Sequence, residues 1–501
     1  MFVRKKKNRS GSVSIQIIKK INRVNKIVKT IGSSKDPVEI DRLFQKGLYE
    51  LPRLHGATLF DQIHEPNIGE LSNDNIRVVG PELVFGRIFQ HIGFSVINDP
   101  IFKDMSISRI THPGSKLKLS QYLRENNKED ISEDRIYYFM DRLNNSYKDQ
   151  VEEISFRYTK KVLGGNIGIV FYDMTTIYFE SDHNDEFLET GFSKEGKHQN
   201  PQIYLGLLVG KSGYPIGYDI FEGSIYEGHT LIPVLERFEK RFSLQKPIVV
   251  ADAGLLSSDN IKALIDKQYS FILGARIKNE SANIKKQILQ LSLSDGQIEK
   301  IVKKDTTNLF VSYSLKRANK DAHNREKGLK RLEKSLKAGR LTKSNINNRG
   351  YNKYLKLEGE VKVEIDYQKF ESDQKWDGLK GYITNTNLSG TEVIESYNNL
   401  WMIEKAFRIS KTDLKIRPIY HRLRERIEAH ICISFVSYLI FKEFERALKD
   451  SNTNISVNQA VKQINKMHEV YFQYSNGNNQ RILLKNNSTQ ELIMEVVNNS
   501  F

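Results

Sequence analysis

The sequence contains a single cysteine, Cys432, among its 501 residues. A lone cysteine excludes an internal disulfide framework and any zinc site built mainly from cysteines. Cys432 lies in the apolar segment AHICISFVSYLIF, where we expect a small buried side chain rather than a reactive thiol. The fold must therefore be held by its core, and 39% hydrophobic residues are enough to form one.

Long apolar runs are also missing. The segment around Cys432 extends for only about a dozen residues before Lys442, which is too short to cross a bilayer. The basic start MFVRKKKNRS is not followed by the apolar core of a signal peptide. These absences predict a cytoplasmic protein with no membrane partner.

Two further kinds of site find no support in the sequence. No G-x(4)-G-K-[ST] loop occurs, so ATP use is not indicated. His198, His229 and His421 do not have the spacing of a zinc-binding helix. We therefore expect neither a nucleotide-binding loop nor a histidine-based zinc site.

Acidic residues are outnumbered by basic ones. The chain has 61 Asp and Glu against 77 Lys and Arg, which gives a formal net charge of +16 and a pI near 9.4. An excess of this size favours a polyanionic partner, because each neutralised phosphate releases counterions. Charge alone leaves DNA, RNA and an anionic membrane open.

Three of the acidic residues have unusual surroundings. Asp173 lies within the apolar and β-branched run GIVFYDMTTIYFE, Asp252 ends the short strand pattern KPIVVAD, and Glu404 lies in the periodic helical segment ESYNNLWMIEKAFRISK. A carboxylate at the end of a buried strand is costly unless it is paired or binds a metal. The three residues together predict a divalent metal site, with a chance triple among the 61 acids as the alternative.

Magnesium is the expected metal, and manganese could replace it, because hard divalent ions take oxygen ligands. Two such ions can stabilise both the attacking and the leaving oxygen of a phosphodiester transfer. We predict that Asp173 is shared by both metals and that Asp252 and Glu404 each complete one side.

The segment around Glu404 also carries candidate DNA contacts. On one continuous helix Tyr397, Glu404, Arg408 and Lys411 would lie along one face. Lys411 and Arg408 would then hold phosphates, while Tyr397 would pack against the strand end; a plain Glu404–Arg408 ion pair is the alternative. The basic side is predicted to continue along the DNA backbone through Lys415, Arg417, Arg422 and Arg426.

The chain is divided by its patterns into successive regions. Residues 1–80 form a basic β or arm region, with two strands expected in VSIQIIKKINRVNKIVKTIGSS. Residues 81–163 are helical and predicted to bind DNA. Two helices joined through NNKED could form a helix-turn-helix reader that presents Arg135, Tyr137, Tyr138, Arg142 and Lys148. Packing alone would produce the same spacing.

An α/β catalytic core is expected beyond residue 163. Residues 164–278 contain strands with a hairpin at Lys211–Gly213, followed by alternating helices and strands, which predicts a mixed sheet flanked by helices. Asp252 and Glu404 are 404 − 252 = 152 residues apart, so a basic insertion is placed at 279–380. Residues 381–450 complete the core, and 451–501 form a helical tail. Trp376, inside the insertion, could stack on a base or belong to the core.

The spacing around Glu404 resembles a known signature. Tyr397, Leu400, Glu404 and Lys411 match Y-x(2)-R-x(3)-E-x(6)-K of DDE transposases from bacterial insertion sequences, the IS-four superfamily, except that Leu400 stands in the Arg position. The resemblance implies an RNase H-like core with Asp173 and Asp252 on adjacent central strands, and a largely β insertion that clamps DNA.

The same resemblance implies a function. It predicts cut-and-paste transposition, with binding of terminal inverted repeats and target DNA by a homodimer assembled on the DNA ends. Leu400 leaves a hairpin intermediate open. A DNA-binding regulator that keeps the fold without chemistry, and a structure-specific metal-dependent nuclease, are the alternatives.

Overall fold

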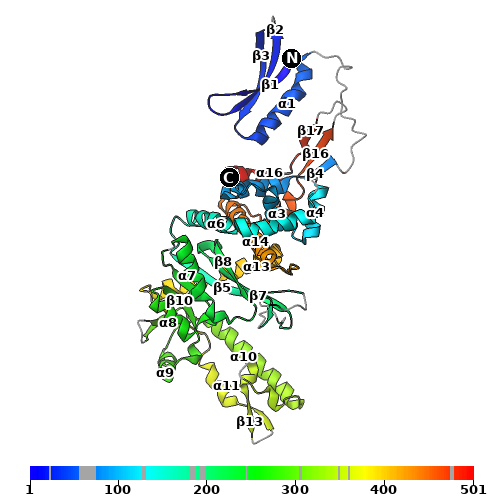
Figure 1. The fold of residues 1–501 in the computed structure, drawn as a ribbon. Helices are drawn as coiled ribbons and strands as arrows, with labels where there is room; N and C mark the ends of the chain where they lie inside the picture. Colours follow the sequence, from blue (N-terminus) through cyan, green and yellow to red (C-terminus); the bar gives the residue numbers. More distant parts are fainter. Residues whose placement is uncertain are drawn as a thin grey trace. The chain divides into compact units, whose positions relative to one another are not determined.

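The computed structural model describes residues 1–21, 24–55, 75–126, 131–180, 185, 187–191, 196, 198–243, 245–303, 307–347, 350–358, 362–473 and 479–501. The chain divides into two compact units (Figure 1). One comprises Met1–Arg77 with Glu469–Leu484, and the other comprises Val78–His468 with Lys485–Phe501. Each unit is described by itself.

The first unit begins with an antiparallel sheet and a helix. Strands β1 (Phe2–Lys7), β2 (Val13–Ile21) and β3 (Val24–Ser34) pair in that order, and helix α1 (Pro37–His55) packs against them. The two strands expected from the sequence are confirmed as β2 and β3. Strand β1 and the 19-residue helix α1 were not predicted.

A smaller sheet in the order β17-β16-β4 includes strands from the C-terminal region. Its members are β4 (Ile76–Val78), β16 (His468–Gln473) and β17 (Asn479–Leu483). The prediction of a helical tail at 451–501 is therefore wrong in part. The helices α15 (Val457–Ile464) and α16 (Ser488–Ser500) flank a hairpin whose residues, such as Val470 and Ile482, pair across strands.

The second unit is built on a mixed sheet with the predicted RNase H-like arrangement. Its centre has the strand order β8-β7-β5-β9-β10. The first three strands pair antiparallel, whereas β5, β9 and β10 run parallel. These strands are β5 (Ile169–Tyr178), β7 (Pro201–Val209), β8 (Pro215–Glu222), β9 (Ile248–Ala251) and β10 (Ser270–Ala275). A short strand, β6 (Glu189–Thr190), pairs with β7.

The insertion contributes to this sheet rather than standing apart from it. Strands β11 (Ile298–Val302), β12 (Asn308–Tyr313) and β15 (Leu379–Thr384) continue the sheet beyond β10 with antiparallel pairing. The boundary predicted at residue 380 therefore falls inside β15. Trp376, just before that strand, is partly buried and packs against the sheet core.

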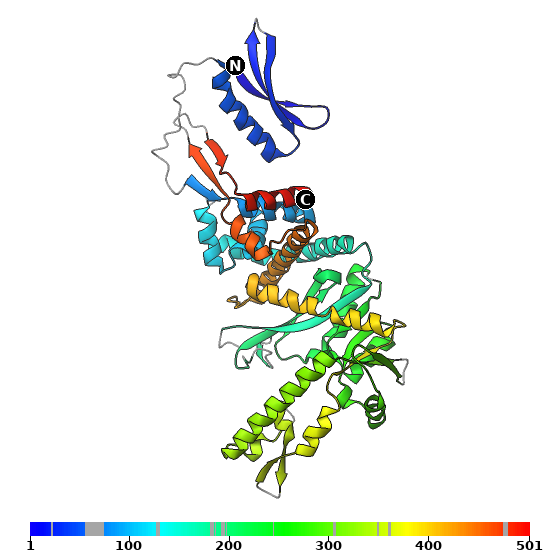
Figure 2. The ribbon, with the colours of Figure 1, turned by 180° about the vertical axis from the view of Figure 1, so that it is seen from behind.

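The rest of the insertion is mainly helical, contrary to the largely β insertion that the resemblance implies. Its longest element is helix α10 (Leu315–Lys337), which lies beside the paired strands β13 (Leu355–Glu358) and β14 (Lys362–Ile365) (Figure 2). Helix α11 (Tyr367–Gln374) leads back to the sheet. A small core that includes Leu332 and Tyr354 holds this part together.

The two faces of the sheet pack against different helices. Alternate residues of β5, such as Tyr172 and Met174, face a core that includes α7 (Leu231–Phe242) and α8 (Ser258–Asp266). The intervening residues, such as Phe171 and Ile177, face the core formed with α14 (Arg424–Asp450). The sheet is therefore buried on both sides, as its apolar strands predict.

The helical layer surrounds α14 and confirms the helices expected between residues 81 and 163. Cys432 is buried in α14, and burial raises the pKa of its thiol to about 12, so the expectation of a packed side chain is confirmed. The other helices of this layer are α2 (Arg87–Ile92), α3 (Pro100–Thr111), α4 (Lys116–Glu125), α5 (Glu133–Arg142) and α6 (Lys148–Val162). No helix within the described ranges is both long enough and apolar enough to span a membrane.

Helices α4 and α5 are the two that were predicted to form a DNA reader, and their joining segment at 127–130 lies outside the described residues. Several of the predicted reading side chains make internal contacts instead. Arg142 contacts Asp99 at 3.4 Å, and Lys148 donates to Glu428 at 2.7 Å. Arg426 lies over the ring of Tyr137, 4.8 Å from its centroid. These contacts hold α5 and α6 in the helical layer.

Candidate active site

Asp173 lies on the central strand β5, on the side of the sheet that faces α14. Strand alternation places Thr175 on the same side as Asp173. The Asp173 side chain is half-buried, and its Oδ1 accepts a hydrogen bond of 2.8 Å from the backbone N–H of Met174. The strand thus holds one carboxylate at the middle of the sheet.

The strand register brings Asp252 next to Asp173. Strands β5 and β9 run parallel, and Tyr172 pairs with Ala251 at the end of β9. Asp173 and Asp252 each follow these paired residues, and neighbouring strands are about 4.8 Å apart. Asp173 lies on β5 and Asp252 directly follows the neighbouring strand β9, so the predicted proximity of the two aspartates is confirmed at the level of the backbone.

Tyr397 donates a hydrogen bond to Asp252. Its hydroxyl lies 2.8 Å from Oδ1 of Asp252. Burial, and then the charge of Asp252, raise the pKa of Tyr397, so the phenol stays protonated as the donor. Gly274 on β10 leaves room for this contact, because a Cβ there would lie 2.4 Å from the Tyr397 hydroxyl. The ring of Tyr382 packs edge-on against Tyr397 with centroids 5.0 Å apart.

Glu404 lies on helix α13 (Trp401–Arg408), which contacts β5 and β7, and its side chain is exposed. Its charge acts on two groups that also sense Asp252. Burial and Arg317 lower the pKa of Lys380, while Asp252 and Glu404 oppose that shift. Both carboxylates also act to raise the pKa of Tyr397. Lys380 and Tyr397 are therefore each close enough to both Asp252 and Glu404 for the two negative charges to affect their pKa values.

Lys380 was not recognised from the sequence. Its ammonium lies 4.4 Å from the centroid of the Tyr397 ring. It is one lysine of a Lys-rich region, and no local pattern distinguishes it from its neighbours. Only the pairing of β15 with β10 brings it to the site.

The prediction that Tyr397, Glu404 and Lys411 share one continuous helix face is wrong. Tyr397 belongs to α12 (Gly390–Asn398), Glu404 to α13, and Lys411 to the π-helical turn η12 (Ile409–Asp413). The break falls at two consecutive asparagines, which favour helix ends over helix interiors. The segment still reaches β5, because Lys411 Nζ donates to Thr175 Oγ1 at 2.5 Å.

Comparison with known proteins agrees with this geometry. A family model described as the transposase DDE domain matches residues 164–440, which is more than half of the chain. The chain belongs to the DDE transposase family. No curated protein matches this transposase.

Among solved structures, the transposase is similar to a piggyBac transposase synaptic complex with hairpin DNA, determined by cryo-EM. The identity is 8%, the TM-score is 0.41, and the match covers 77% of this chain and 76% of that one. The RNase H-like arrangement of the chain is defined by its own strand order.

The basic residues predicted to contact DNA lie in different surroundings in the transposase. The side chains of Arg408, Lys415 and Arg422 are exposed. The guanidinium of Arg417 lies 5.7 Å from the centroid of the Tyr178 ring. Together with Lys411, these residues remain candidates for phosphate contacts.

Arg426 does not fit the predicted role. Its guanidinium donates two hydrogen bonds to the Asp141 carboxylate, at 2.8 and 2.9 Å. The hydrogen bond from Arg426 lowers the pKa of Asp141. Arg426 therefore links α14 to α5. It is removed from the residues that were predicted to follow the DNA backbone.

The three carboxylates of the transposase are more accessible than the sequence suggested. Asp252 and Glu404 are exposed, and Asp173 is half-buried. The cost of burying a charge, which favoured a metal site in the sequence, therefore concerns only Asp173, and that side chain is only partly buried. Within the described ranges, no group of three or more His, Cys, Asp or Glu residues is close enough to hold a metal ion. The donor chemistry of Asp173, Asp252 and Glu404 nevertheless fits a hard cation, since all the donors are carboxylate oxygens.

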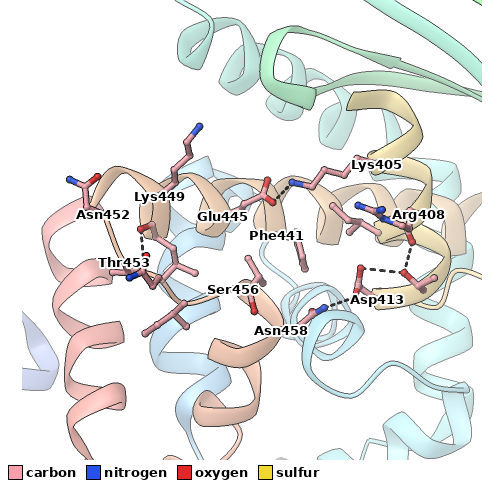
Figure 3. A pocket seen from close by; sticks show the side chains of 16 residues that line it. Lys405, Arg408, Asp413, Phe441, Glu445, Lys449, Asn452, Thr453, Ser456 and Asn458 are labelled. Carbon is pink, nitrogen blue, oxygen red and sulfur yellow. Dashed lines mark hydrogen bonds and ion pairs between the residues drawn. The ribbon is translucent and has the colours of Figure 1, made fainter. Parts of the chain in front are cut away.

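A cavity of about 820 Å³ lies beside the helix that carries Glu404 (Figure 3). Lys405 and Arg408 of α13 line it, and Lys405 forms a 2.5 Å ion pair with Glu445 across it. None of the three predicted catalytic carboxylates lines this cavity. An accessible position outside a closed pocket suits a substrate as wide as duplex DNA.

Proposed function

We propose that this DDE transposase cleaves DNA at the ends of its own element and joins the freed ends to target DNA. Asp173, Asp252 and Glu404 are the proposed catalytic residues and the ligands of Mg²⁺, for which Mn²⁺ can substitute. The main support is the β5–β9 register, which sets Asp173 beside Asp252 in a chain that carries a transposase DDE domain.

Bound divalent metal would supply electrophilic activation of the phosphodiester and of the attacking oxygen. Side chains of the transposase would position the metal ligands and balance their charge. Tyr397 holds one oxygen of Asp252 by its hydrogen bond and so fixes the direction in which the other oxygen points. Lys380 offsets part of the negative charge of Asp252 and Glu404 while the site holds no metal.

Phosphate binding is assigned to the basic residues around α13. Lys411 is placed beside the Asp173 side of β5 by its contact with Thr175, and Arg408 is exposed one turn earlier. A cation there would hold the DNA backbone next to the carboxylates. Lys415, Arg417 and Arg422 complete the proposed DNA-contacting set. Tyr397, which was predicted to belong to it, is buried and bonded to Asp252, and is assigned to positioning that carboxylate.

The proposed DNA partners are the terminal inverted repeats of the element and the target duplex. The net charge of +16 supplies the attraction to both. We propose that a homodimer holds two ends together, so that both can be joined to the same target.

A plasmid assay tests the proposed function. The substrate carries the sequences that flank this coding region on both sides of a marker, and the purified transposase is added with Mg²⁺. Excision of the marker and its covalent joining to a second plasmid are expected. Cleavage without joining would point to a nuclease, and binding without cleavage would point to a DNA-binding regulator.

A further inference from the structure

Strand β15 brings a lysine to the same end of the sheet as Asp252. It pairs antiparallel with β10, and its Gly381 lies opposite Ala275, the last residue of β10. Strand β10 in turn runs parallel to β9, which Asp252 directly follows. Lys380, directly before Gly381, therefore lies where β9 and β10 end.

The side chain of Lys380 lies on the face of the sheet that carries Asp173. Residues two apart in a strand share a face, and Tyr382 is buried in the core formed with α14. The ammonium of Lys380 lies 5.2 Å from the ring centroid of Tyr382 and 4.4 Å from that of Tyr397. Because the Tyr397 hydroxyl donates to Asp252 at 2.8 Å, a single aromatic ring separates the ammonium from that carboxylate.

Lys380 has no acidic partner in contact with it. Its side chain is half-buried, yet within the part of the chain that the structure describes its ammonium forms neither an ion pair nor a hydrogen bond. By contrast, the half-buried Lys148 pairs with Glu428 at 2.7 Å, and the half-buried Lys303 pairs with Glu280 at 2.8 Å. A partly buried charge without a partner is costly, so this position favours a ligand that supplies negative charge.

The surrounding charges agree with this interpretation. Burial, and then the charge of Arg317 near the start of α10, lower the pKa of Lys380. Asp252 and Glu404 offset only part of that shift. An anion beside Lys380 would therefore be attracted by two cations, of which only Arg317 has an acid in contact, Asp321 at 3.5 Å.

The helical segment opposite Lys380 lacks a cation that the signature contains. The signature has an arginine where this chain has Leu400, and Leu400 is buried in the apolar core with 7% of its surface exposed. No Lys or Arg occurs between Tyr397 and Glu404. Lys380 brings a positive charge to Tyr397, three residues before Leu400, from a strand that precedes this segment in the chain.

Lys380 and Lys411 lie on opposite sides of Asp252 along the sheet. Lys411 contacts Thr175 on β5, one strand from β9, whereas β15 is two strands from β9 in the other direction. Since neighbouring strands are about 4.8 Å apart, the two lysines are far enough apart to hold different phosphates of one DNA strand.

We infer that Lys380 is a further substrate contact of the site: its ammonium binds a backbone phosphate of the DNA beside Asp252 and supplies the positive charge that Leu400 lacks. The inference rests on the proposed function, since it names the group that holds the DNA on the β15 side of the carboxylates.

The test combines a change in the chain with a change in the DNA. Lys380→Met removes the charge and keeps an unbranched side chain beside the two tyrosine rings. Each probe is a duplex with the terminal sequence that flanks the coding region, in which one phosphate near the cleavage point is replaced by an uncharged methylphosphonate. Affinity is measured with the full chain and without divalent metal. One of these replacements should weaken binding of the unmodified chain about fivefold or more, but that of Lys380→Met less than about twofold, because the contact is already lost.

Two further variants separate contact from structure. Lys375→Met is the control, because Lys375 is exposed and lies five residues earlier in the same segment, and it should show the full methylphosphonate effect. Lys380→Arg keeps the charge and should also retain the effect. Lys380→Met should melt at or above the temperature of the unmodified chain, since it removes a half-buried charge that has no partner.

The inference would be overturned if no methylphosphonate weakened the unmodified chain, or if every one weakened Lys380→Met to the same extent. A clear drop in the melting temperature of Lys380→Met, with equal weakening on all duplexes, would make Lys380 a structural cation instead. The proposed function is judged separately by cleavage of the unsubstituted duplex in Mg²⁺. Failure to cleave would count against that function, while the metal-free affinities would still test the phosphate contact.

Discussion

Gly274 sets the geometry around Asp252 at the scale of a single residue. The Tyr397 hydroxyl can donate to Asp252 only because Gly274 has no side chain, since a Cβ would lie 2.4 Å from it. Gly254, two residues after Asp252, is a natural comparison, because a Cβ there would meet nothing within 4 Å. A side chain would therefore collide with Tyr397 at position 274 but would meet no neighbour at position 254.

Gly274→Ala should therefore lower the rate of end cleavage, whereas Gly254→Ala should not. We expect a loss of about tenfold for Gly274→Ala, because displacing a positioning group at a reacting centre has effects of that order or more. Tyr397→Phe, which removes only the hydroxyl, should give a loss of similar size, and combining it with Gly274→Ala should add little. Multiplicative losses in the double variant would show that Gly274 acts on something other than Tyr397.

Lys411 is the residue that tests the phosphate assignment. Lys411→Ala should weaken binding to end and scrambled duplexes by the same factor and reduce the salt slope by about one unit. Lys405→Ala is the control, because Lys405 is paired with Glu445 at 2.5 Å. If Lys411→Ala changed sequence preference with the slope intact, Lys411 would be a base contact and the assignment would be wrong.

Some residues of the site could be predicted from the sequence and others could not. Asp173 and Asp252 could be found because each interrupts or ends an apolar strand pattern, and Tyr397 and Glu404 because they share a spaced signature. Gly274 and Lys380 could not, since their proximity depends on how β9, β10 and β15 pair across the sheet. The break between α12 and α13 was missed because periodicity continues through Asn398 and Asn399.

Helix α14 anchors the helical layer to the sheet through a buried acid. Glu443 has no exposed side-chain surface and accepts a hydrogen bond of 2.6 Å from Tyr214, in the hairpin between β7 and β8. Arg446 donates to the same carboxylate at 3.1 Å through Nε. Burial alone would raise the pKa of Glu443, but the hydrogen bonds from Arg446, Tyr214 and Tyr158 outweigh it and lower the pKa below 4.5.

Glu443→Gln should destabilise the second unit by about 1–3 kcal/mol at pH 7, the range for a buried hydrogen-bonded charge. Because the folded pKa is lowered, the ionised carboxylate stabilises the fold above the unfolded value of 4.5, and this contribution is lost as the pH falls through the folded pKa. Denaturant unfolding at pH 7 and near pH 3 should show the difference shrinking at the lower pH. A difference that stays constant would mean that charge plays no part.

Elements of the fold were predictable to different degrees. The alternation of β5 and the β9-α8-β10 unit are strong local patterns, and the structure confirms them. The insertion was misplaced because β15 pairs with β10 and β12, partners that are far away in the chain. Helix α10 has a mainly charged sequence, which is typical of a solvated helix face. Its few apolar residues, such as Leu332, gave no indication that the helix would form a small core with β13 and β14.

At the scale of the whole molecule, the excess of positive charge and the candidate catalytic carboxylates lie in different parts of the chain. Most of the net positive charge lies in the first 55 residues, whereas the three candidate catalytic carboxylates lie in the second unit. If the three carboxylates share a metal, as proposed, their like charges would disfavour the metal-free state. Binding of a metal to the folded state alone should stabilise the second unit by linkage.

Thermal melting should reveal this linkage. Millimolar Mg²⁺ is expected to raise the melting temperature of the unmodified chain, and Asp173→Asn should lose most of that increase. In EDTA, Asp173→Asn should melt at or above the temperature of the unmodified chain, because one of the repelling charges is gone. If Mg²⁺ had no effect and Asp173→Asn melted clearly lower in EDTA, Asp173 would be a structural carboxylate.

The most direct measurement of the central claim exchanges the proposed metal ligands for a softer donor. Asp173→Cys, Asp252→Cys and Glu404→Cys are each assayed for cleavage of end DNA in Mg²⁺ and in Mn²⁺, with Asp259→Cys on α8 as the control. Thiolate ligands bind Mg²⁺ poorly and accept softer ions better. We predict that each of the three variants fails to cleave in Mg²⁺, that at least one regains activity in Mn²⁺, and that the control cleaves in both. Normal cleavage in Mg²⁺ by any of the three would contradict its assignment as a metal ligand.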